Sequence, residues 1–103
     1  MHRQIDAAEL LERINKGEAL NLLDVRETIE YHTFNIGGKN IPIGLIDPNL
    51  ALAAYNKTDE IIVICSVGLR SETAAKLLFA NGYENVKNLT GGILALRKIR
   101  EQE

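Results

Sequence analysis

Cys65 and the residues that follow it are the part of the chain best suited to covalent chemistry. A thiolate is a strong nucleophile, and Cys65 is the only cysteine among the 103 residues. It directly follows residues 61–64, a run of β-branched apolar residues that predicts a strand buried on both faces. Ser71 is of the type that caps helices, so we expect a helix to begin there. The sequence therefore predicts a thiol at the carboxyl end of a strand, with a helix N-terminus behind it that favours negative charge.

The composition of this loop predicts an activated thiol. Gly68 supplies the backbone freedom that a loop of inward-pointing amides requires, and Arg70 brings a cation near the nucleophile. Burial disfavours the thiolate, whereas converging N–H groups favour it, and we expect the N–H groups to prevail. The pKa of Cys65 is then predicted to lie below that of a free cysteine. An inert buried thiol is the alternative, because free cysteines are often small core residues.

Other charged positions have two possible roles. Asp24 and Arg26 lie at the carboxyl end of another predicted strand, so their side chains can point toward the rim that carries Cys65. An internal ion pair that holds their loop is the favoured alternative to direct chemistry. Arg70 fits either an anionic substrate or a salt bridge within the fold, and we expect a mixed role. Ser71 is expected to act as a hydrogen-bond and cap residue.

The rest of the chain alternates between predicted strands and helices. Strands are expected at residues 4–5, 20–25, 39–41, 61–64 and 86–89. Helices are expected at about 6–17, in a brief run up to 31, at 71–81 and after the double glycine at 91–92, with one or two helical turns within 45–55. Their predicted apolar positions are Leu10, Leu11 and Ile14, then Ala74, Ala75, Leu77, Leu78 and Phe79, and last Ile93, Leu94, Leu96 and Ile99. The alternation predicts one α/β domain over residues 1–103, a parallel sheet with helices on both faces.

Composition excludes several classes of protein. The chain is 46% hydrophobic with a formal charge of -2, which suits a single core and gives no basic stripe for nucleic acid. It contains no stretch that predicts a membrane span and no secretory signal. One cysteine forms neither an internal disulfide nor a Cys-rich zinc site, and His2 and His32 are expected at the surface. We therefore expect a cytoplasmic protein with no metal, cofactor, membrane or nucleic-acid partner.

Four patches carry a resemblance to a known family. In chain order they are Leu22-Leu23-Asp24-Val25-Arg26-Glu27 with Glu30-Tyr31 behind it, Gly38-Lys39-Asn40-Ile41-Pro42, Cys65-Ser66-Val67-Gly68-Leu69-Arg70-Ser71, and Asn88-Leu89-Thr90-Gly91-Gly92-Ile93. This ordered set resembles a rhodanese domain, here as a single-domain sulfurtransferase. The resemblance implies a rhodanese-like three-layer sandwich. It also implies that a sulfane sulfur passes from a donor such as thiosulfate, through a persulfide on Cys65, to a thiophilic acceptor (cyanide, a thiol or a protein).

The resemblance also assigns roles to the loop and leaves the donor open. The backbone amides of Ser66, Val67, Gly68, Leu69 and Arg70 are implied to cradle the persulfide. Some thiosulfate-using members place a cation two residues after the cysteine, where this chain has Val67. A small anionic sulfur donor and a thiophilic acceptor or acceptor protein are the expected partners.

Two alternative functions remain open. Phosphatases and arsenate reductases of related fold place five residues between the cysteine and the arginine, whereas only residues 66–69 separate Cys65 from Arg70. The shorter ring suits a single sulfur atom rather than an oxyanion, so this alternative is the weaker one. A persulfide carrier or partner-binding module is the stronger one, because an intact cysteine loop does not separate a turnover enzyme from a sulfur relay.

Overall fold

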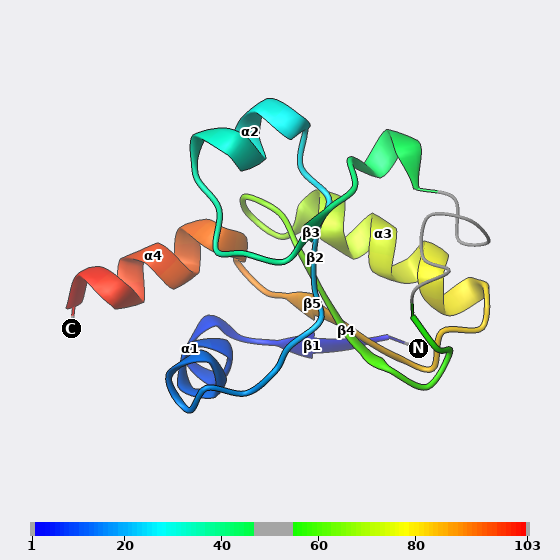
Figure 1. The fold of residues 1–103 in the computed structure, drawn as a ribbon, viewed down its shortest axis with the longest axis horizontal. Coiled ribbons are helices and arrows are strands. Elements are labelled where there is room, and N and C mark those ends of the chain that lie inside the picture. Colours follow the sequence, from blue (N-terminus) through cyan, green and yellow to red (C-terminus); the bar gives the residue numbers. More distant parts are fainter. Residues whose placement is uncertain (1, 47–54, 103) are drawn as a thin grey trace.

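A five-stranded parallel sheet forms the centre of the computed structural model, which describes residues 2–46 and 55–102 (Figure 1). The strands are β1 (Arg3–Ile5), β2 (Leu22–Asp24), β3 (Lys39–Asn40), β4 (Glu60–Ile64) and β5 (Asn85–Leu89), in the spatial order β1-β5-β4-β2-β3. Every neighbouring pair is parallel. The helical elements are α1 (Ala7–Asn15), α2 (Thr28–Thr33), the 3-10 turn η1 (Ile43–Leu45), α3 (Leu69–Ala80) and α4 (Gly92–Gln102). The predicted α/β class is confirmed.

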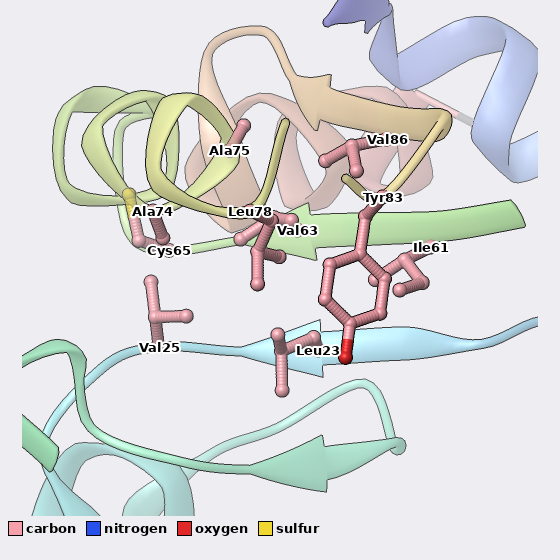
Figure 2. Close-up of a cluster of buried hydrophobic side chains, with 10 residues drawn as sticks. All are labelled: Leu23, Val25, Ile61, Val63, Cys65, Ala74, Ala75, Leu78, Tyr83 and Val86. Carbon is pink, nitrogen blue, oxygen red and sulfur yellow. The ribbon is translucent and has the colours of Figure 1, made fainter. Parts of the chain in front are cut away.

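Strand β4 divides the apolar interior into two cores, because its successive side chains point to opposite faces of the sheet. Ile61, Val63 and Cys65 pack on the face covered by α3 (Figure 2). Ile62 and Ile64 pack on the other face with side chains of α1 and α4. All five side chains are at most 1% exposed. Helices therefore cover both faces of the sheet, as predicted, and Cys65 lies in the α3 layer. No helix in the described ranges has the length and apolar character needed to cross a bilayer.

Helix α3 begins two residues earlier than predicted. Gly68 is its N-cap and has a left-handed backbone, with φ of 97°. Ser71 is therefore not a cap; it lies inside the first turn, and its side chain is fully buried. The sequence pattern placed a good capping residue at 71, but the turn at Gly68 lets the helix start before it.

Several predicted apolar positions are exposed. Leu77 and Phe79 are each 38% exposed and Leu94 is 48% exposed. The buried residues of α3 are at 71, 74, 75 and 78, and those of α4 at 92, 93 and 96, so the three exposed side chains lie off these helical stripes. The helical turns predicted within 45–55 fall mostly outside the described residues; the described part contains only the end of η1.

The two histidines differ in how far their side chains are exposed. His2 was predicted at the surface, but its side chain is only 8% exposed and Nε2 lies 2.7 Å from Oε1 of Glu72. The prediction failed because the partner is 70 residues away in the sequence. His32 is exposed, as expected.

The double glycine places the first turn of α4 directly against the Cys65 loop. The amide of Ile93 donates to the carbonyl of Cys65 at 2.9 Å, and the amide of Leu94 donates to the carbonyl of Ser66 at 3.1 Å. Gly92 has φ of 65°, and a Cβ there would lie 2.4 Å from the carbonyl oxygen of Ser66. Only glycine permits this close approach, so Gly92 determines where the loop can lie.

We predict that Gly92→Ala destabilises the protein by about 3 kcal/mol, because it combines left-handed strain with a clash against backbone. Gly44→Ala is the matched control, since Gly44 has no positive φ and its Cβ would meet nothing within 4 Å. The control should change the free energy of unfolding by less than about 0.5 kcal/mol. Urea denaturation of both variants measures the difference. Equal losses of unfolding free energy in the two variants would show that the contact between α4 and the loop is not tight.

Candidate active site

The sulfur of Cys65 lies in a ring of hydrogen-bond donors. The Gly68 amide donates to Sγ at 3.1 Å, and the Ser71 amide donates to it at 3.3 Å. The hydroxyl oxygen of Ser71 lies 3.2 Å from the same sulfur. Cys65 itself is 1% exposed. The strand end, the loop and the first turn of α3 thus bring three polar groups onto one buried thiol.

The loop can turn its amides inward because its carbonyls are satisfied elsewhere. The carbonyl oxygens of Cys65 and Ser66 accept from the first amides of α4, which a helix N-terminus leaves free. Gly68 completes the turn in a left-handed conformation, and a Cβ there would lie 3.2 Å from backbone atoms of Gly91 and Leu89. Carbonyls therefore face α4 while amides face the sulfur.

Opposing effects act on the ionisation of Cys65. Burial is the largest single effect and raises the pKa of the thiol. Hydrogen bonds from the side chain of Ser71 and from the amides of Ser71, Gly68 and Val67 act the other way, and together they hold the pKa below that of an ordinary thiol. The predicted direction is confirmed. Arg70 contributes as well, because the charge of the Cys65 thiolate is one of the causes that raise the pKa of Arg70. The hydrogen bonds from neutral N–H and O–H donors are the larger stabilising effects on the thiolate.

Arg70 ties the loop to helix α2. Its guanidinium donates to both oxygens of Glu30, at 2.7 and 3.0 Å, and to Oγ of Ser66 at 3.2 Å. These bonds to Arg70 are the main reason that the pKa of Glu30 falls to about 2. Glu30 lies in the brief helix that the sequence predicted, and it is half-buried and paired. Sequence reasoning missed this role because 40 residues separate the two partners.

Asp24 and Arg26 form the internal ion pair that the sequence favoured. Asp24 is fully buried and Arg26 is 5% exposed. The guanidinium donates to the carboxylate from Nε at 3.0 Å and from Nη2 at 2.8 Å, and Nη2 also donates to the carbonyl of Phe34 at 2.7 Å. The pair therefore holds the loop after β2 against the end of α2.

Asn88 is a buried polar residue whose role the sequence did not reveal. Its Oδ1 accepts from the Ser71 hydroxyl, and its Nδ2 donates to Glu72 at 2.8 Å and to Gln4 at 3.1 Å. The Ser71 hydroxyl has one proton and two possible acceptors, Asn88 Oδ1 and the thiolate. When Cys65 is protonated, its S–H can instead donate to Ser71. A buried amide in strand β5 was the available signal, since buried polar groups need partners.

A cavity of about 360 Å³ opens beside the loop. Ser66 contributes to its lining, together with residues of α2 and α4. In the described ranges, 2–46 and 55–102, no group of three or more His, Cys, Asp or Glu side chains is arranged to hold a metal ion.

Residues 6–98 match the family model described as the rhodanese-like domain. The chain belongs to this family. Among relatives, it is 31% identical over 96 residues to "Sulfurtransferase" of Allochromatium vinosum, covering 92% of this chain and 88% of that one. It is 35% identical over 91 residues to "Putative sulfur carrier protein YrkF" of Bacillus subtilis, covering 87% of this chain but only 48% of that protein. The chain spans about a quarter to a half of the length of the first relatives it matches.

Solved structures confirm that the fold is rhodanese-like. A rhodanese-like domain protein from Staphylococcus aureus matches with a TM-score of 0.79 at 28% identity, covering 91% of this chain and 90% of that one. The human single-domain sulfurtransferase TSTD1 matches with a TM-score of 0.72 at 26% identity, covering 97% and 96% of the two chains. Together with the sheet and its two helical layers, these matches confirm the expected three-layer sandwich.

We predict that Ser71→Ala raises the pKa of Cys65, because it removes a hydroxyl that hydrogen-bonds the thiolate while leaving the amides in place. The rate of iodoacetamide alkylation against pH should show an inflection below the free-cysteine value of about 8.5 in the unaltered protein. The inflection should move upward in Ser71→Ala. Ser66→Ala is the matched control, since the Ser66 hydroxyl accepts from Arg70. An unmoved inflection in Ser71→Ala would show that the amides alone set the pKa.

Proposed function

We propose that the protein is a sulfurtransferase that carries a sulfane sulfur as a persulfide on Cys65. The observation that carries this proposal is the buried sulfur that accepts hydrogen bonds from the Gly68 and Ser71 amides. Converging hydrogen bonds of this kind stabilise an anionic sulfur. An unpaired cysteine also fits a reducing, cytoplasmic setting.

The first half-reaction loads the cysteine. The Cys65 thiolate attacks the outer sulfur of a donor such as thiosulfate, and a new S–S bond forms at Sγ. The S–S bond of the donor breaks, and sulfite leaves with the electron pair. The loop amides of residues 66–70 then cradle the terminal sulfur of the persulfide. No organic cofactor takes part in this step.

The second half-reaction unloads it. A thiophilic acceptor attacks the terminal sulfur, the bond to Sγ breaks, and Cys65 leaves as a thiolate. Stabilisation of that thiolate by Ser71 and the amides makes it a good leaving group, so one set of hydrogen bonds serves both half-reactions. Arg70 contributes by fixing the loop to α2, since both of its terminal nitrogens are engaged by Glu30.

A persulfide carrier is the second candidate. The similarity to YrkF favours it, because that protein is named a putative sulfur carrier. This chain spans about half of the length of YrkF. In a carrier the acceptor is a partner protein, and small acceptors turn over slowly. Phosphatase activity is the weaker alternative, because four residues separate Cys65 from Arg70 and the guanidinium is paired with Glu30.

We predict that incubation with thiosulfate adds one sulfur atom to the intact mass of the protein. Addition of cyanide should remove that mass, with formation of thiocyanate. Cys65→Ser should fold and gain no sulfur, because it lacks the only thiol. Mass spectrometry and the thiocyanate assay measure the two steps. Sulfur uptake by Cys65→Ser, or faster hydrolysis of para-nitrophenyl phosphate than sulfur transfer, would contradict the proposal.

A further inference from the structure

The cavity beside the Cys65 loop has apolar walls that remain exposed to solvent. Helix α2 contributes Ile29, which is 76% exposed, and α4 contributes Leu94, which is 48% exposed. Phe34 and Ile93 line it as well, and Ser66 connects it to the catalytic loop. No residue of α2 is buried, and Ile29, Glu30 and Thr33 of this helix line the cavity.

Two more exposed apolar side chains follow Ser66 in the loop. Val67 is 50% exposed and Leu69 is 75% exposed, and neither lines the cavity. Both follow Ser66 closely in the chain, and the Arg70–Glu30 ion pair ties this part of the loop to α2. We name Ile29, Val67, Leu69 and Leu94 the apolar collar. Exposed apolar side chains gathered around a reactive group are typical of a surface that another molecule covers.

The charges at the cavity favour an anionic partner. Arg26 is paired with Asp24, and Glu30 is paired with Arg70. Arg97 lies over the ring of Phe34 at 4.2 Å, and it has no carboxylate partner among the residues that the structure describes. It also borders a neighbouring hollow that contains Arg100 and Glu101. Within the described part of the chain, Arg97 is thus the cavity cation without a carboxylate partner, and an aromatic face holds it in place.

The cavity and the neighbouring hollow share Phe34 and Arg97 as lining residues, and we treat the two together as one groove. Leu94, Arg97 and Glu101 recur at helical spacing on α4, so the groove follows that helix away from Ser66. The rise from residue 94 to residue 101 is about 10 Å, the length of about three residues of extended chain. A small thiol that fills the cavity would leave Val67 and Leu69 uncovered, whereas a polypeptide can cover the collar and reach Arg97.

We infer that the acceptor of the proposed sulfurtransferase is a cysteine-bearing protein segment that docks on the apolar collar. An apolar side chain next to the acceptor cysteine enters the cavity, and an acidic residue two to four positions away pairs with Arg97. This inference rests on the proposed function and adds the chemistry of the acceptor. The acceptor thiolate attacks the terminal sulfur of the Cys65 persulfide and forms a new S–S bond. The bond to Sγ breaks, its electron pair leaves with Cys65, and the acceptor becomes the persulfide.

Three synthetic peptides test the inference in single-turnover transfer from thiosulfate-loaded protein. The first has the sequence Gly-Leu-Cys-Gly-Asp-Asp; the second replaces Leu by Ser, and the third replaces both Asp by Lys. The first peptide should remove the persulfide at least tenfold faster than either of the others. Equal rates for all three peptides and for 2-mercaptoethanol would overturn the inference and point to a small acceptor.

Variants assign the preferences to the two sides of the groove. Ile29→Ser should abolish the preference for Leu and keep that for Asp, whereas Arg97→Gln should do the reverse. Leu77→Ser and Arg3→Gln are matched controls on exposed residues of α3 and β1, and they should keep both preferences. Loss of both preferences in the controls, or retention of both in Ile29→Ser and Arg97→Gln, would overturn the assignment.

A binding measurement separates this inference from the proposed function. Fluorescence anisotropy follows the first peptide, with Ser in place of Cys, as it binds the unloaded protein. Failure of thiosulfate to load Cys65 would reject the proposed donor chemistry. The docking surface would still be supported if Ile29→Ser and Arg97→Gln each weaken peptide binding at least fivefold. Binding that neither variant changes would overturn it.

Discussion

The two hydrogen bonds from the start of α4 to the carbonyls of Cys65 and Ser66 are the constraint on which the site depends. They satisfy the polar groups that would otherwise point into the loop, so the amides are free to face the sulfur. Gly92 allows the helix to come close enough, because any Cβ there would overlap the carbonyl of Ser66. The last helix of the chain thus shapes a loop that begins at the end of the central strand.

The charge of the nucleophile is balanced mainly by neutral dipoles. Burial raises the pKa of Cys65, and the donors from Ser71, Gly68 and Val67 reverse that effect. The one cation of the loop is paired with Glu30, and it adds only a smaller Coulombic attraction to the sulfur. A thiolate held by dipoles can be formed, loaded and released without rearranging an ion pair, which suits a sulfur that alternates between thiolate and persulfide.

The sequence contained the local parts of this arrangement. The run at 61–64 predicted a buried strand, and Gly68 predicted a turn with its amides toward Cys65. The position of α3 was less predictable, since Ser71 is a good cap but its hydroxyl is used by the sulfur and by Asn88. Glu30 and Asn88 could not be assigned because their partners are 40 and 17 residues away. Such pairings depend on how the strands and helices are arranged in space, which residue spacing does not contain.

The most direct test of the account is whether the loop amides respond to ionisation of the sulfur. The backbone amide resonances of Gly68 and Ser71 should be followed by ¹⁵N-resolved NMR as the pH is raised. Because both amides donate to Sγ, we predict that they shift together, with one inflection below the free-cysteine value of about 8.5, and that the inflection is absent in Cys65→Ser. Amide resonances that stay constant while the thiol ionises, or an inflection above that value, would contradict the account.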